Sequence, residues 1–397
     1  MAEYKDRERF IPITTSEIVE NLSEELKGDK KEQFKRFSLI LENLIHYEFQ
    51  ERIEELEDLY FPFDPDTDKI SLKDISSFEL NKNKDVFYEK ITKLLEKANF
   101  NKIDEDELDY ALKEDSEIAV EVEIDKDDFE DLHLFKRGET KRKDKIPKYF
   151  WIFKKFFKKE IELDIYKRIV MIIKFDESYD PMKTSLKKDI QKDKIHLKIF
   201  KNVPKKDIEM ILPNPKIKMS LIDKLKIGLP VLIGIGAGAA KFLRVIQGTS
   251  ETIVTISVLI ALAGYMIKSY VSYKNTILDY ITNLTSGLYF KNLGNNESVM
   301  HYLTNEAEEE EVKETILAYY FIHNNQGITI KELDDKVEGW FKYKGVYIDW
   351  EVEDAVSKLE NHELIKKYEG DGLKVIGLDK ALVKLDNIWD NYFEYNA

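Results

Sequence analysis

Two uncharged, strongly apolar runs that lie close together constrain this chain more than any other feature. The first spans residues 227–240 and the second spans residues 252–267. If Lys241 and Lys268 extend their charged ends toward an interface, each segment reaches about 20 residues, enough to cross a hydrocarbon core of ~30 Å. The runs predict a two-helix transmembrane hairpin over residues 223–275, with a buried helical hairpin as the alternative.

The residues in and around the predicted hairpin suggest how it packs and how it is oriented. Gly234 and Gly238 are four positions apart, and such small residues let helices approach closely in lipid. Lysines flank the hairpin on its outer sides, and the loop between the runs has none. This bias predicts that both termini are cytoplasmic. Many Lys and Asn residues with few Arg suggest a bacterial source, so we expect the chain at a bacterial cytoplasmic membrane. The two glycines also make a homo-oligomer possible.

Charge is distributed unevenly along the chain, whose net charge is −15. Residues 134–226 hold 27 Lys and Arg against 13 Asp and Glu, a net charge of +14, whereas residues 301–397 hold 11 against 22, a net charge of −11. The basic block leads directly into the predicted hairpin. This placement suggests an anionic lipid bilayer as a partner.

An aromatic and basic stretch within the basic block is the candidate lipid-contact surface. Rings beside lysines suit the headgroup level of an anionic membrane. The alternatives are a strand with one face in a core and, less favoured, a stacking platform for single-stranded nucleic acid. The candidate contact residues are Trp151, Phe153, Lys154, Lys155, Phe156, Phe157, Lys158 and Lys159.

Periodicity predicts an α+β chain. Apolar residues recur at helical spacing between residues 34 and 49, whereas residues 118–124, 166–175 and 195–200 alternate as strands do. We expect a helical N-terminal region, a small basic β-containing middle domain, the two-helix transmembrane hairpin, a helical connector and an acidic winged-helix-like C-terminal domain. The predicted boundaries are 1–115, 116–222, 223–275, 276–310 and 311–397.

The acidic C-terminal domain is predicted to bind protein and not DNA. Its third helix, in the position of a recognition helix, carries Asp349, Glu351, Glu353 and Asp354. DNA affinity depends on cationic contacts to phosphate, and these carboxylates would repel the backbone. They form instead a candidate surface for an unknown protein partner.

Chemical motifs are sparse in this sequence. The absence of cysteine excludes disulfides and thiolate metal sites. Asp64, Asp66 and Asp68 resemble the start of a calcium loop, but position six lacks the required glycine, so a turn is favoured. We predict no catalytic residue, metal or cofactor. The enzyme alternative would rest on Asp207 and Glu209.

Several segments resemble the transmembrane protein 143-like family, whose shared region is domain of unknown function 3754. They occur in the family's order at residues 9–13, 45–49, 60–66, 197–213 and 307–320. The resemblance implies a membrane-associated protein with two close transmembrane segments. It implies no activity and no catalytic residue.

Together these observations predict a membrane-anchored adaptor or scaffold whose other domains face the cytoplasm. The hairpin would hold the chain, the basic block would lie on lipid, and the acidic domain would recruit a protein. An oligomeric membrane effector or pore is one alternative. An uncharacterised membrane-bound enzyme is the other.

Overall fold

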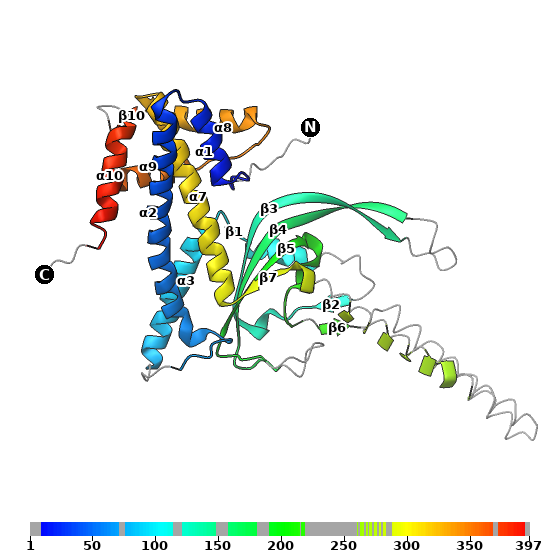
Figure 1. The fold of residues 1–397 in the computed structure, drawn as a ribbon. Helices are drawn as coiled ribbons and strands as arrows, with labels where there is room; N and C mark the ends of the chain where they lie inside the picture. The colour runs from blue at the N-terminus through cyan, green and yellow to red at the C-terminus, as the bar shows by residue number, and fades with distance from the viewer. Residues whose placement is uncertain are drawn as a thin grey trace, which may run out of the picture.

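The computed structural model describes residues 9–70, 76–113, 121–147, 158–180, 190–214, 216–218, 288–367 and 372–393, with isolated residues between 260 and 282. Figure 1 shows the path of the chain. Its helices include α1 (Thr15–Glu24), α2 (Asp29–Tyr60), α3 (Ser77–Lys97), α4 (Glu105–Lys113), α7 (Glu297–Asn324), α8 (Ile330–Tyr343), α9 (Val352–Asn361) and α10 (Leu378–Asp390), with short 3-10 turns at Phe61–Phe63, Lys126–Asp128 and Lys205–Met210.

The strands of the described residues form three sheets. A five-stranded antiparallel sheet has the order β1-β3-β4-β5-β7, a three-stranded sheet has the order β8-β10-β9, and β2 pairs with β6. The bounds are β1 (Asn101–Lys102), β2 (Glu121–Glu123), β3 (Phe129–Pro147), β4 (Lys158–Phe175), β5 (Ile195–Pro204), β6 (Lys216–Lys218), β7 (Asn292–Asn295), β8 (Ile328–Thr329), β9 (Ile365–Lys367) and β10 (Gly372–Val375).

The long helices α2 and α7 lie side by side and form the centre of a helical layer (Figure 1). The apolar face of α2 follows the predicted 3.6-residue period, because residues three and four apart share one side of a helix. Phe37 of that face stacks on Tyr319 of α7 with ring centroids 4.1 Å apart. One apolar cluster runs from Ile11 to Leu385, so N-terminal and C-terminal helices share a core.

The five-stranded sheet packs against this helical layer through one of its faces. Val170 and Ile172 of β4 join the helical cluster, whereas Ile169, Met171 and Ile173 point to a second cluster with α4 and the Lys205–Met210 turn. Successive side chains of a strand point to opposite faces. Because both faces of this part of β4 are covered, its residues 169–173 are all apolar.

Arg137 of β3 connects the sheet to the helices. Its guanidinium lies 2.6 Å from the Glu306 carboxylate of α7 and donates to the Ala98 carbonyl at 3.1 Å. The rings of Phe10 and Phe100 lie 4.3 and 4.8 Å from it. Arg137 is only 7% exposed, so the ion pair is largely removed from water.

A buried ion pair of α7 holds the N-terminal segment in place. Lys313 and Glu310 are 2% and 1% exposed and lie 2.9 Å apart. The Ile11 amide donates to Glu310 at 2.8 Å, and Lys313 donates to the Ile11 carbonyl at 3.1 Å. Both backbone groups of Ile11 are therefore satisfied by side chains of one helix.

The C-terminal residues form a small α/β unit on this core. Thr329 caps α8 through reciprocal bonds with Glu332. β9 and β10 form a hairpin, β8 adds a third strand, and α10 packs on α2. The division of the chain into five domains stays a prediction; α7 passes without a break through residue 310.

The predicted fold class needs correction. The chain is a mixed α/β protein built on a five-stranded antiparallel sheet, and the predicted two-helix transmembrane hairpin is wrong, because none of the helices in the described residues is long and apolar enough to cross a membrane. The longest, α2 and α7, carry many charged residues. Each uncharged run is shorter than the about 20 residues that a membrane-spanning helix needs. The first run ends at Lys241 and the second ends at Lys268. The first run, with Gly234 and Gly238, lies outside the described residues.

Candidate functional site

A cavity of about 240 Å³ lies where α2, α3, α7 and α9 meet. Its walls are almost entirely polar or charged. Helix α7 supplies Glu311 and Glu314, the loop before α9 supplies Glu351, and α9 supplies Asp354. The other lining residues are Arg52, Glu96, Lys97, Asn99, Ser357, Lys358 and Asn361.

Glu314 is the unusual group of this cavity. Its side chain is 9% exposed, yet no hydrogen bond or ion pair reaches its carboxyl from the described residues. Burial raises the pKa of Glu314 well above the ordinary value, and the negative charges of Glu310, Asp354, Glu311 and Glu351 raise it further. A carboxyl of this kind in a cavity is a common property of functional sites.

Glu311, which follows Glu310 in α7, has a pKa shifted in the opposite direction. Lys97 of α3 and Lys358 of α9 each place a nitrogen 2.5 Å from its carboxylate oxygens. Burial alone would raise the pKa of Glu311, but Lys358 and Lys97 outweigh it and hold the pKa at about 2. Lys358 also pairs with Glu48 of α2. The lysines of the cavity are therefore already engaged.

Helix α8, the loop that follows it and the start of α9 carry an acidic surface, which we call the acidic face. It comprises Asp334, Asp335, Glu338, Asp349 and Glu353. Burial, followed by the charges of Glu338, Asp335, Asp349 and Glu353, raises the pKa of Asp334 to about 6. The like charges of this face therefore act on Asp334 in addition to its burial.

The four acids predicted as a partner surface fall into two groups in the structure. Asp349 and Glu353 are exposed and act on Asp334, whereas Glu351 and Asp354 line the cavity. Glu351 also pairs with Arg9. The sequence had placed all four on one helix without this division.

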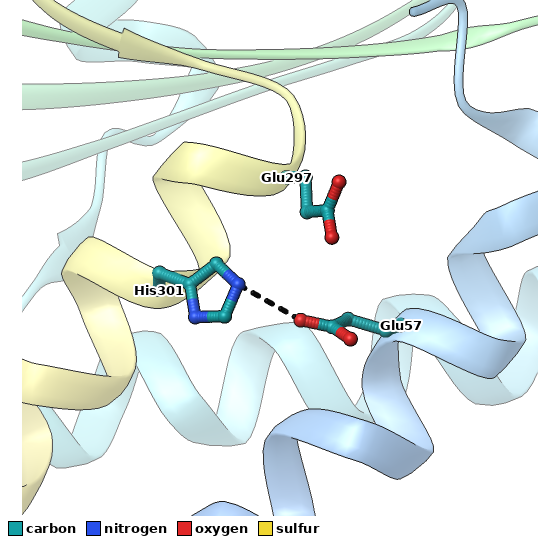
Figure 2. A group of neighbouring side chains, drawn as sticks. All are labelled: Glu57, Glu297 and His301. Carbon is teal, nitrogen blue, oxygen red and sulfur yellow. Dashed lines mark ion pairs between the residues drawn. The ribbon is translucent and has the colours of Figure 1, made fainter. Parts of the chain in front are cut away.

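A third group joins the end of α2 to the start of α7. Figure 2 shows Glu57 of α2 with Glu297 and His301 of α7. His301 Nε2 lies 2.9 Å from a Glu57 oxygen, and one ligand atom from each residue lies within 4.8 Å of the others. Such spacing can hold a divalent ion, but Glu297 and His301 are exposed, and His301 with Glu57 is also an ordinary surface ion pair.

Several predicted site residues are not placed by the structure. Trp151, Phe153, Lys154, Lys155, Phe156 and Phe157 lie outside the described residues, and Lys158 and Lys159 are described only as the backbone start of β4. Of the two carboxylates suspected for an enzyme, Glu209 is buried in the Lys205–Met210 turn. The Asp207 side chain is not described. Asp64 accepts from the Asp66 amide at 3.0 Å, as in the predicted turn.

Comparison with known proteins identifies one region of the chain. A family model described as "Protein of unknown function (DUF3754)" matches residues 166–298. This match supports the presence of the domain of unknown function 3754. It covers most of β4, all of β5 and β7, and the first residues of α7. No solved structure matches the chain.

The DUF3754 match lies apart from the cavity. All the lining residues of the cavity fall outside 166–298, in α2, α3, α7, α9 and the adjoining loops. Of the group in Figure 2, Glu297 alone falls within the match. The cavity has therefore to be interpreted from its own geometry.

Proposed function

We propose that the chain is an adaptor that binds a basic protein surface through the acidic face of α8 and α9. The crowding of like charges around Asp334 is the observation that carries this proposal. Burial, and after it the charges of Glu338, Asp335, Asp349 and Glu353, raise the pKa of Asp334 to about 6, and a cationic partner would relieve the repulsion among these acids. Complementary charge of this kind steers association and selects partners.

The size of the expected effect follows from the exposure of the acids. Asp335 and Glu353 are exposed, so each contact with a partner lysine contributes about 0.5 kcal/mol. Removing both charges should weaken binding about fivefold. Because the contacts are exposed, added salt should screen them.

The test compares two variants of the full chain that lose the same charge. One carries Asp335→Asn and Glu353→Gln on the acidic face; the control carries Asp58→Asn and Asp85→Asn, exposed positions of α2 and α3. Binding of a fluorescent ten-residue oligolysine is followed by anisotropy. The proposal expects about fivefold weaker binding for the acidic-face variant alone. Equal losses in both variants would mean that only net charge matters and would refute it.

The other predictions about function remain predictions. They include contact with anionic lipid, a bacterial cytoplasmic membrane location, homo-oligomers, and the pore and enzyme alternatives. We also propose the narrower resemblance to transmembrane protein 143-like proteins. Its support is the order of the quoted segments, of which residues 197–213 lie within the DUF3754 match.

A further inference from the structure

The cavity between α2, α3, α7 and α9 contains a carboxyl without a counterpart. Burying a carboxyl costs free energy unless a hydrogen bond or an opposite charge compensates. Glu314 is 9% exposed and receives neither from the described residues. Its carboxyl lines the cavity, so a molecule inside the cavity can reach it.

Not all acids of the cavity are paired with a basic side chain of the described residues. Lys97 and Lys358 are taken up by Glu311 and Glu48, and Arg52 lies 3.7 Å from Glu48 and 3.9 Å from Glu311. Arg9 forms an ion pair with Glu351. Glu314 and Asp354 remain as acids that no basic side chain of the described residues pairs with.

The dimensions favour an organic cation over a metal ion. A volume of about 240 Å³ holds several waters at ~30 Å³ each. In the described part of the chain, Glu57, Glu297 and His301 form the one group whose ligand atoms gather as around an ion. The carboxylates of the cavity are more widely spaced. Ser357 and Asn99 add hydrogen-bonding oxygens to its wall.

We propose that this cavity binds a primary ammonium or guanidinium group, with Glu314 and Asp354 as the acceptors of its N–H donors. Such a group supplies both the charge and the hydrogen bonds that Glu314 lacks. It can belong to a free small amine or to a lysine or arginine side chain of a protein. The site goes beyond the adaptor function and uses none of the residues of the acidic face.

Binding of a cation should displace the proton of Glu314. The groups around this carboxyl are Glu310 and Glu311 from α7, Glu351 and Asp354 from the α9 side, Lys358 from α9, Lys97 from α3 and Arg52 from α2. Burial and the neighbouring acids raise the pKa of Glu314 well above its ordinary value, which favours its protonated form. A bound cation stabilises the carboxylate, and up to one proton is released per site.

The experiment is calorimetric titration of the full chain at pH 7 with agmatine, and separately with the peptide Gly-Gly-Arg-Gly-Gly. Repetition in buffers of different ionisation enthalpy counts the released protons. We expect saturable binding with proton release, weakened at least about tenfold by Glu314→Gln, which also abolishes the release. The control Glu105→Gln, an exposed position of α4 outside the cavity, should change affinity less than about twofold.

The two probes separate the sources of the cation. Tight binding of agmatine alone identifies a small amine, whereas binding of both probes identifies an arginine side chain. Absence of saturable binding by folded wild-type chain, or equal affinity for the wild type and Glu314→Gln, would overturn the proposal. Neither result bears on the oligolysine assay of the acidic face, so the two proposals fail independently.

Discussion

Replacing Glu311 with glutamine should show how much the buried charge network stabilises the fold. The pKa of Glu311 lies at about 2 instead of 4.5. At about 1.4 kcal/mol per pKa unit, the difference corresponds to about 3 kcal/mol. Glu311→Gln also leaves Lys358, which is 7% exposed, with Glu48 alone. The variant should therefore lose about 3 kcal/mol of unfolding free energy at pH 7.

The pH dependence of this loss gives the sharper test. The folded pKa of Glu311 is below the unfolded value, so its contribution is complete above pH 4.5 and disappears as the pH falls toward 2. At pH 3 less than half of the difference between wild type and variant should remain. Urea unfolding followed by tryptophan fluorescence measures it, with Glu96→Gln as an exposed control.

Two outcomes would refute this reasoning. A loss below about 1 kcal/mol at pH 7 would mean that Lys97 and Lys358 do not stabilise the Glu311 carboxylate as their 2.5 Å distances indicate. A large loss that stays constant between pH 7 and pH 3 would point to packing instead of charge.

Three further predictions concern the rest of the chain. Arg137→Ala should cost about 3 kcal/mol in urea unfolding, because it leaves Glu306 without its buried partner; a loss under 1 kcal/mol would contradict this role. Gly327→Ala should cost about 1–2 kcal/mol, because φ is +90° while space for a methyl group is open, and a neutral effect would show that the backbone relaxes. The full chain should not bind a 20-base-pair duplex at micromolar concentration in about 150 mM salt, measured by anisotropy; such binding would restore a DNA-binding role.

The sequence predicts the elements whose signals are local. The 3.6-residue spacing of Phe34 and Phe37 predicted α2, and alternation predicted β4 and β5. These signals depend on neighbouring positions of one element. Such signals can therefore be recognised from the sequence alone.

Features that depend on distant contacts were missed. Strand β3 contains many charged residues and was not predicted; it is fixed by pairing with β4 along its whole length. The acid-rich run 306–314 lies within α7, and nothing in its sequence separates Glu311, which pairs with two lysines, from Glu314, which pairs with no basic side chain of the described residues. Their difference arises from the side chains that α3 and α9 supply.

The transmembrane prediction failed for a related reason. Uncharged length was extended past Lys241 and Lys268 by assuming that both lysines reach an interface. Hydropathy alone cannot establish that assumption. The candidate cavity, by contrast, could not be predicted at all, because its walls come from segments more than 250 residues apart, such as Arg52 and Asp354.

Charge reversal of the acidic face tests the adaptor proposal most directly. Asp335→Lys with Glu353→Lys converts two exposed acids of this face into bases, while Asp58→Lys with Asp85→Lys makes the same change in net charge elsewhere. The measurement is the affinity of each full chain for oligolysine and for oligoglutamate at the same salt concentration. The proposal predicts that the reversed face loses oligolysine at least about tenfold and gains oligoglutamate, while the control changes little. If both variants shift their affinities equally, the acidic face is not a binding surface.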